Sequence, residues 1–225
     1  MSCTKLKKEQ WQKYIHGMLI GYKLKKNAEY VGICLKTSFY LRHKILNDLN
    51  LFLGNGELQG LIEMDETFFP ESFKGNNIKS GLEMPRISRK RGKQVSTRGL
   101  SQEQICVATA LDRQNNLIIG VIGRSRPTCE QFKGLYSTCI NKESTIVTDS
   151  LRSYIPFIKD LDVPHVQIAS GKHKNGLYHI NHINSLHARL KDFMRGFKGV
   201  STKYLDNYMV WFKWLEFYGK KKKRL

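Results

Sequence analysis

The fold is decided by the stretch Leu61-Ile62-Glu63-Met64-Asp65-Glu66-Thr67-Phe68-Phe69. Its length and its aliphatic and aromatic side chains predict a strand from Leu61 to Phe69. Alternate residues of a strand face the same side, so Glu63, Asp65 and Thr67 share one face. A charge inside so apolar a strand is costly unless it is paired or bound to a metal ion. Asp65 is therefore the first candidate site residue.

The segments that follow predict a sheet and the helices that cover it. Further strands are expected at Ile105–Asp112 and Leu117–Gly123, joined by a polar turn, and then at Ser144–Thr148 and Val163–Ala169. Helices are expected at Thr128–Ile140, Leu151–Leu161, Ile183–Phe197 and Lys203–Tyr218. Strands that first follow one another and then alternate with helices predict an α/β (α+β) fold, in which helices flank one mixed sheet.

Residues 1–50 have the apolar spacing of helices, around residues 11–19, over Leu24–Val31 and over Lys36–Leu49. Ala28 and Gly32 fit the close packing and the turn of a helix-turn-helix. The third helix would then present side chains suited to DNA phosphates and base edges, namely Lys36, Thr37, Ser38, Tyr40, Arg42 and His43. A plain helical cap on the next domain explains the same pattern equally well.

Charge is the strongest global signal. The 225 residues include 38 Lys+Arg and 19 Asp+Glu, which leaves a formal net charge of +19. Such a surface repels itself unless it meets a polyanion, and nucleic acid is the usual one. A ribosome-associated protein and a membrane-surface binder are the alternatives. With 40% hydrophobic residues the chain can bury a core, so wholesale disorder is not expected.

The cysteine content and the apolar runs of the sequence indicate the cellular compartment of the protein. The five cysteines include no C-x-x-C pair, so we expect free thiols in a reducing compartment and neither a disulfide frame nor a zinc site. No run approaches the ~18 apolar residues of a membrane span, and charged residues precede any apolar run at the start of the chain. We expect a cytoplasmic protein without a membrane partner.

Glycines and basic runs divide the chain. Residues 1–50 form the helical arm, 51–60 a glycine-rich linker, 61–218 the main domain and 219–225 a basic tail. An insertion at 71–104 carries the basic residues Arg89, Lys90, Arg91, Lys93 and Arg98. Its one-sided charge favours contact with a DNA backbone over a merely solvated loop.

Two more segments carry candidate site residues. Asp149 lies near the end of the run Thr145–Ser150, where a buried strand is expected to meet a helix. The alternative to a site residue is an ordinary helix N-cap, since Asp is favoured at that position. On the helix after His182, helical periodicity puts Asn184, His187, Lys191 and Arg195 on one face. Leu186, Leu190, Phe193 and Phe197 fall on the opposite face. An amide oxygen of Asn184 can bind a metal ion and Lys191 can hold a phosphate, although an ordinary amphipathic helix has the same pattern.

These segments together resemble bacterial insertion-sequence transposases with an ISXO-like catalytic domain, which are relatives of the eukaryotic Merlin elements. The stretches that match the catalytic domain are 63–69, 71–75, 89–92, 98–104, 147–150, 184–191 and 197–208. Residues 37–46 match the family's DNA-binding arm. Relatives usually carry a zinc ribbon before this arm, so the ribbon is expected to be missing here and the copy to be truncated or begun at a late start codon.

The resemblance implies a ribonuclease-H-like fold and a set of four catalytic residues, Asp65, Asp149, Asn184 and Lys191. Asp65, Asp149 and Asn184 would hold two Mg²⁺ (or Mn²⁺) ions, with no zinc, and His187 is the rival of Asn184 as third ligand. The expected partners are the element's terminal inverted repeats and target DNA, contacted also by Arg195, with the protein acting as a homo-oligomer at the bacterial nucleoid. A relic that only binds DNA and a structure-specific nuclease are the alternative functions.

Overall fold

The computed structural model describes residues 5–54, 56–75, 103–172 and 174–221. The chain falls into two compact units, Met1–Gly54 with Val210–Leu225, and Asn55–Met209. The second half of the last helix therefore groups with the N-terminal helices, whereas the sequence put residues up to 218 in the second domain. Most of the predicted basic insertion lies outside the described residues. None of the described helices has the length and hydropathy of a membrane crossing.

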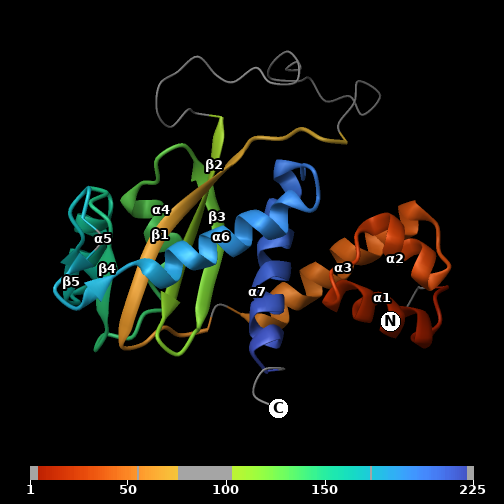
Figure 1. Ribbon diagram of the computed structural model, residues 1–225, viewed down its shortest axis with the longest axis horizontal. Helices are drawn as coiled ribbons and strands as arrows, with labels where there is room; N and C mark the ends of the chain where they lie inside the picture. The colour runs from red at the N-terminus through yellow and green to blue at the C-terminus, as the bar shows by residue number, and fades with distance from the viewer. Residues whose placement is uncertain (1–4, 55, 76–102, 173, 222–225) are drawn as a thin grey trace. The chain divides into compact units, whose positions relative to one another are not determined.

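The second unit is built on a five-stranded sheet in the order β3-β2-β1-β4-β5. Its strands are β1 (Leu61–Pro70), β2 (Gln104–Asp112), β3 (Leu117–Arg124), β4 (Thr145–Thr148) and β5 (His165–Gln167). The pairs β1–β2 and β2–β3 are antiparallel, and β1–β4 and β4–β5 are parallel (Figure 1). The predicted mixed sheet is confirmed, with β1 at its centre.

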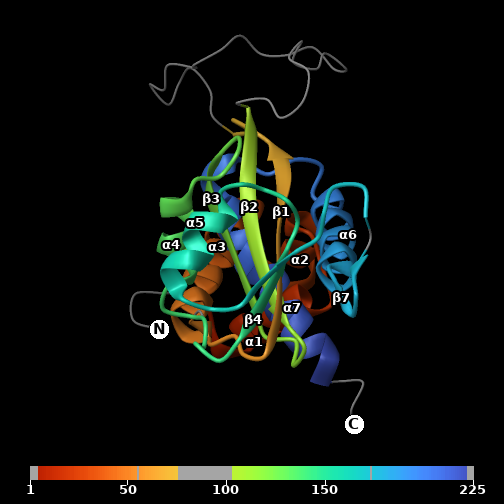
Figure 2. The same ribbon diagram turned by 90° about the vertical axis from the view of Figure 1, so that its left-hand side faces the viewer.

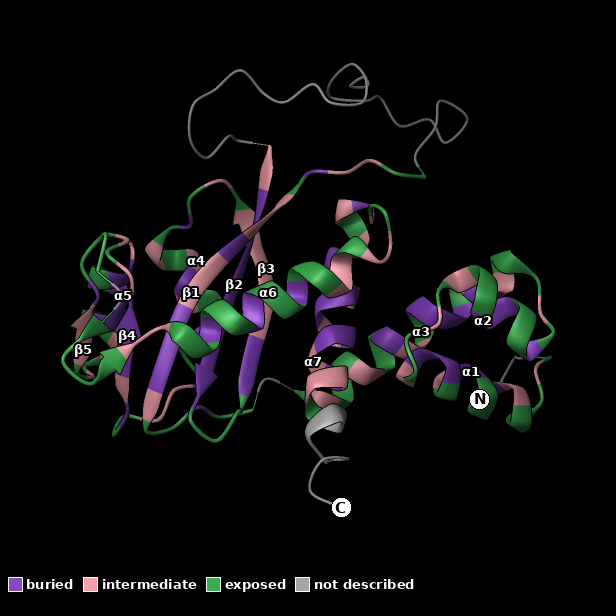
Figure 3. Ribbon diagram, viewed as in Figure 1, coloured by how far each residue is buried: buried purple, intermediate pink, exposed green. Residues whose placement is uncertain are grey.

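Helices cover both faces of this sheet, as Figure 2 shows. On one face α4 (Cys129–Tyr136) and α5 (Tyr154–Leu161) pack their aromatic rings against Ile62 and Met64 of β1 in the main hydrophobic core. On the other face α6 (Asn181–Arg195) contacts β1 and β2. Because strand residues alternate, Asp65 faces α6. The predicted α/β class with flanking helices is therefore confirmed, and Figure 3 shows buried residues along β1 and β2.

Element bounds differ from the prediction mainly at the ends. The helix predicted over Thr128–Ile140 stops at Tyr136, and Thr128 caps it by accepting a hydrogen bond from the Gln131 backbone. A two-residue hairpin of β6 (Lys174–Asn175) and β7 (Tyr178–His179) before α6 was not predicted. The last predicted helix is a short 3₁₀ turn, η2 (Thr202–Tyr204), followed by α7 (Leu205–Lys221).

The first unit contains the three predicted helices, α1 (Lys8–Leu19), α2 (Leu24–Val31) and α3 (Leu35–Leu53). Gly32 ends α2 in the left-handed region, at φ +74°, as the turn prediction requires. The helix α3 runs through the first three residues of the predicted linker.

The predicted DNA-reading face of α3 is only partly at the surface. Lys36 and Tyr40 are exposed and Thr37 is half-buried, but Ser38, Arg42 and His43 are buried. The guanidinium of Arg42 donates to the Tyr22 carbonyl (2.7 Å) and stacks on Trp211 (4.5 Å). The expectation that all six residues face DNA therefore fails for these three, because they pack inside the unit.

Candidate active site

The first predicted aspartate, Asp65, lies on β1, and the second, Asp149, directly follows the neighbouring strand β4. In the parallel pair of β1 and β4, Met64 stands opposite Thr148. The next residue on β1 is Asp65, and the residue that directly follows β4 is Asp149. Residues paired in this way point to the same face of a sheet. The register therefore places Asp149 next to Asp65, near enough for the charge of Asp149 to act on the Asp65 carboxyl.

The electrostatics of Asp65 agree with this placement. Burial raises the pKa of its carboxyl to about 7, and the negative charge of Asp149 acts in the same direction. A backbone hydrogen bond and the positive charge of Lys191 lower it. The charges of Asp149 and Lys191 thus both reach the Asp65 carboxyl.

Asp149 also has a structural role. Its Oδ1 accepts a hydrogen bond from the Leu151 backbone at 2.9 Å, which closes a turn after β4. The helix α5 begins later, at Tyr154 with Ser153 as its N-cap residue, so Asp149 is not the helix cap that the sequence offered as an alternative. One carboxylate oxygen of Asp149 therefore fixes the turn after β4.

His187 is the residue of α6 that touches Asp65. Its Nδ1 lies 3.4 Å from Asp65 Oδ2, and its Nε2 lies 2.6 Å from the hydroxyl of Thr109. That hydroxyl also donates to the Asp65 carbonyl oxygen at 2.9 Å. The sequence placed His187 on the open face of α6, but the imidazole is buried with Ile183, Leu186 and Leu190, between the Thr109 hydroxyl and the Asp65 carboxylate.

These contacts and the burial of the ring determine the protonation state and the tautomer of the His187 imidazole. Burial lowers the pKa of His187 to about 4, and Lys191 adds to the effect, so the ring is neutral near pH 7. The Thr109 hydroxyl has one proton, which it donates in the hydrogen bond to the Asp65 carbonyl oxygen. The hydroxyl must therefore accept in its hydrogen bond with His187, and Nε2 of His187 is the donor. The lone pair of Nδ1 then faces the Asp65 carboxylate, an arrangement that is repulsive unless a proton or a cation compensates it.

Asn184 and Lys191 flank His187 on the same stripe of α6. They lie three residues before it and four residues after it, which is about one helical turn in each direction. Both side chains are exposed. Lys191 is close enough for its charge to lower the pKa of Asp65 and of His187. Arg195, one turn further along, is exposed and pairs with Asp192 at 2.9 Å.

Glu63 is a site residue to which the sequence analysis assigned no role, although its place on the Asp65 face was the available signal. The carboxylate is 1% exposed. Its Oε2 accepts from the Ile183 backbone, and its Oε1 lies 2.8 Å from both Arg113 and His182. Glu63, His179 and His182 each offer a ligand atom within 4.8 Å of the others, a grouping that could hold a metal ion. The Arg113 guanidinium already balances this carboxylate.

Glu66 belongs to the opposite face. Burial raises the pKa of its carboxyl to about 8, and a hydrogen bond with Tyr154 opposes the shift. Tyr154 and Tyr136 are fully buried in the core beneath α4 and α5. Neighbouring acidic residues of β1 thus lie in different surroundings, and of these acids only Glu63 and Asp65 face α6.

The predicted DNA contacts Arg89, Lys90, Arg91, Lys93 and Arg98 lie outside the described residues.

Comparison with known proteins gives one strong similarity. A family model for the ISXO2-like transposase domain matches residues 57–216, so the predicted family resemblance is confirmed. Among curated proteins, none matches this chain.

Similarity to solved structures is weak. One chain of a simian T-cell lymphotropic virus intasome in complex with PP2A regulatory subunit B56 gamma has 10% identity and a TM-score of 0.40, covering 89% of this chain and 66% of that one. A pre-cleavage Mos1 transpososome (9% identity, TM-score 0.28) and a Mos1 mariner paired end complex with Mn (10%, 0.27) each cover 98% of this chain and 79% of theirs. Similarities of this size support no conclusion about function.

Proposed function

The chain belongs to the ISXO2-like transposase domain family, and on that premise we propose that it is the transposase of an insertion sequence. In this proposal it binds the terminal inverted repeats of its element, cuts the DNA at their ends and transfers the 3′ ends to target DNA. It does so as a homo-oligomer assembled on DNA.

The observation that carries the proposal is the position of Asp149, which directly follows β4 at the point where β4 pairs with β1 next to Asp65, and whose charge raises the pKa of the Asp65 carboxyl. Two carboxylates side by side, one of them largely buried and with its pKa raised to about 7, favour a bound cation that offsets their repulsion. Oxygen ligands of this kind suit Mg²⁺ or Mn²⁺. These oxygen ligands therefore fit a site for two divalent cations. Asp65, Asp149 and the amide oxygen of Asn184 would hold the two ions.

Such ions activate the attacking oxygen and stabilise the leaving oxygen in phosphoryl transfer. The chain's own residues bind and orient the substrate. The ammonium group of Lys191 positions the scissile phosphate, since it lies one turn from the residue that touches Asp65. The Thr109 hydroxyl bonds both to the Asp65 carbonyl and to His187, and so holds the imidazole next to the strand that carries Asp65.

The charge of the chain supports DNA as its partner. A net charge of +19 favours binding to a phosphate backbone. Within the described residues the exposed Lys36 and Tyr40 of α3 and Arg195 of α6 are proposed to contact DNA, with Thr37. The basic residues Arg89, Lys90, Arg91, Lys93 and Arg98 are proposed to contribute contacts that do not read sequence.

A cleavage assay on duplexes that carry the element's ends tests the proposal. We expect cleavage with Mg²⁺ or Mn²⁺ and binding without cleavage in Ca²⁺. Asp65→Asn should lower cleavage by several orders of magnitude while binding to the ends survives, because one metal-ligand charge is lost with little change in volume. Asp160→Asn is the matched control, since this aspartate is exposed and pairs with Lys133 on α4. Binding without cleavage in Mg²⁺ and Mn²⁺ would instead favour the DNA-binding relic.

A further inference from the structure

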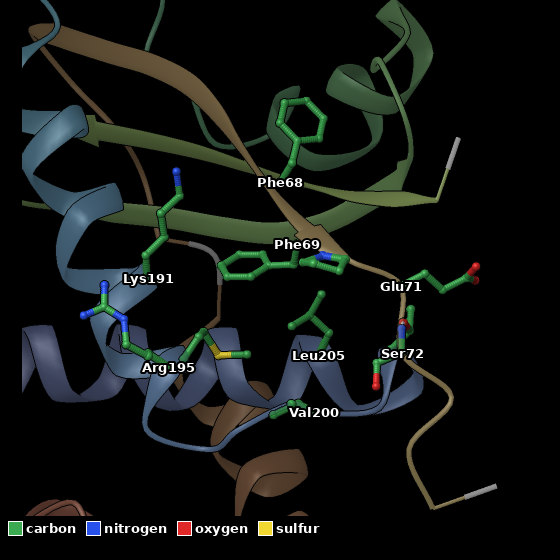
Figure 4. A pocket seen from close by; sticks show the side chains of 12 residues that line it. Phe68, Phe69, Glu71, Ser72, Lys191, Arg195, Val200 and Leu205 are labelled. Carbon is green, nitrogen blue, oxygen red and sulfur yellow. The ribbon is translucent and has the colours of Figure 1, made fainter. Parts of the chain in front are cut away.

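A pocket of about 580 Å³ opens beside the active site, where β1 ends against the last turns of α6. Its lining includes the apolar side chains of Phe69, Met194, Val200 and Leu205 and the cations Lys191 and Arg195. In Figure 4, Phe69 lies between Lys191 and Leu205, and Phe68 also contributes to the lining. The volume lies within the roughly 300–1,000 Å³ of small-ligand sites.

The rim of this pocket is built by contacts between distant segments. The backbone of Ser72 donates to the Thr202 hydroxyl at 2.9 Å, and the Thr202 backbone donates to the Ser72 carbonyl at 2.8 Å. Glu71 is buried and forms an ion pair with Arg124. These bonds hold residues 71–72 against the loop before α7, so the pocket has fixed walls.

The pocket is continuous with the proposed catalytic face. Phe69 is four residues after Asp65 on the same face of β1, about 13 Å along the strand. Lys191 lines the pocket, and its charge also acts on Asp65. Within the described part of the chain, Lys191 makes no hydrogen bond or salt bridge to protein, so its ammonium group can bind an anion. A substrate phosphate held by Lys191 would therefore have the pocket next to it.

We propose that this pocket takes one unstacked nucleobase of the DNA substrate, a few nucleotides or fewer from the cleaved phosphate. The inference rests on the proposed function. An aromatic ring and aliphatic side chains complement the face of a base, and Lys191 and Arg195 complement the phosphates on either side of it. A nucleotide is the ligand class that needs both features at once. The base enters without covalent chemistry, and its extrusion opens the duplex at the cleavage point.

A binding assay in Ca²⁺ tests this with Phe69→Leu, which removes the aromatic ring but keeps an apolar side chain. The probes are duplexes ending in the element's terminal sequence, intact or with a single abasic residue moved through the positions around the cleavage point. Stacking on an aromatic ring is worth enough that Phe69→Leu should weaken binding of the intact duplex roughly 5- to 150-fold. With the abasic residue at the extruded position, the variant and the wild type should bind equally.

Phe52→Leu, at an exposed position of α3 outside the pocket, is the matched control. It should bind every duplex as the wild type does, provided that both variants keep the wild-type circular dichroism spectrum. Phe69→Tyr should retain the binding of the wild type. Equal binding of the intact duplex by wild type and Phe69→Leu overturns the proposal. So does a loss that is the same for every abasic duplex, because the pocket then holds protein from this chain or a second copy.

The outcome is separable from that of the proposed function. Coupling between Phe69 and one base, without cleavage in Mg²⁺, would leave the pocket assigned and the transposase activity refuted. Cleavage without that coupling would refute the pocket alone.

Discussion

The carboxylate of Glu63 accepts a hydrogen bond from the backbone N–H of Ile183 at 3.0 Å, and so joins β1 to the first turn of α6. The first N–H groups of a helix have no partner within the helix, and a carboxylate there is favoured by the helix dipole. Glu63 is two residues before Asp65, and Ile183 directly precedes Asn184. This bond therefore sets the distance between the strand and the helix that carry the proposed metal ligands.

Removing this link should destabilise the fold. Glu63→Ala leaves the Ile183 N–H and the Arg113 guanidinium without their buried acceptor, and we expect the free energy of unfolding in urea to fall by about 3 kcal/mol. Glu63→Gln keeps an oxygen acceptor and should lose less. Glu57→Ala, at an exposed position, should stay within about 0.5 kcal/mol of the wild type. Equal stability of Glu63→Ala and the wild type would show that the link contributes nothing.

The third metal ligand can be identified by substitutions on α6. Asn184→Asp should keep or tighten Mg²⁺ binding, measured by calorimetry, because a carboxylate binds Mg²⁺ better than an amide does. Asn184→Ala should lose cleavage, and Lys191→Ala should lose it less severely through slack positioning of the phosphate. If Asn184→Ala cuts normally and His187→Ala is inactive, the ligand is His187, whose Nδ1 already faces Asp65.

Stability without divalent cations should depend on pH through Asp65. Its ordinary pKa is 3.8 and its folded pKa is about 7, so the stability gained by holding it protonated is present below the lower value. This stability is lost as the pH rises through about 7. In EDTA, the Tm of the wild type should fall between about pH 5 and about pH 9 more than that of Asp65→Asn. Glu66 shifts in the same direction, so a smaller decrease should persist in the variant. Equal pH dependence in the two proteins would rule out this burial of Asp65.

The basic insertion should bind DNA without regard to sequence. Replacing Arg89, Lys90 and Arg91 with alanine should weaken binding to every duplex about equally. The slope of log affinity against log salt should flatten by roughly one unit per lost contact. Fluorescence anisotropy over a salt series, with end duplexes and unrelated duplexes, measures both. A loss confined to the element's ends would mean that these residues read bases.

The sheet could be predicted from the sequence because the residues of each strand by themselves indicate that strand. The apolar run around Asp65 and the short strand before Asp149 each specify a strand, and their parallel pairing then brings the two carboxylates together. The partners of buried polar groups could not be predicted in this way. The guanidinium of Arg42 stacks on Trp211, and the Glu63 carboxylate accepts a hydrogen bond from the Ile183 backbone. The partners in each pair are far apart in the sequence, and helical or strand periodicity predicts only contacts between near neighbours. Helical spacing likewise left His187 on the open face, because it cannot show that Thr109 lies opposite the imidazole.

The order of the strands has a consequence for the time at which the protein becomes active during translation. The meander of β1, β2 and β3 can pair as soon as residue 124 has left the ribosome, since its connections are antiparallel. Asp149 arrives 84 positions after Asp65 by a parallel crossover, and α6 follows later still. A nascent chain therefore carries three of the five strands of its sheet long before it has a complete set of proposed ligands. An interrupted translation product that ends between residues 124 and 149 would have the first aspartate and its strand, but would lack the second aspartate that the proposed cleavage of DNA requires.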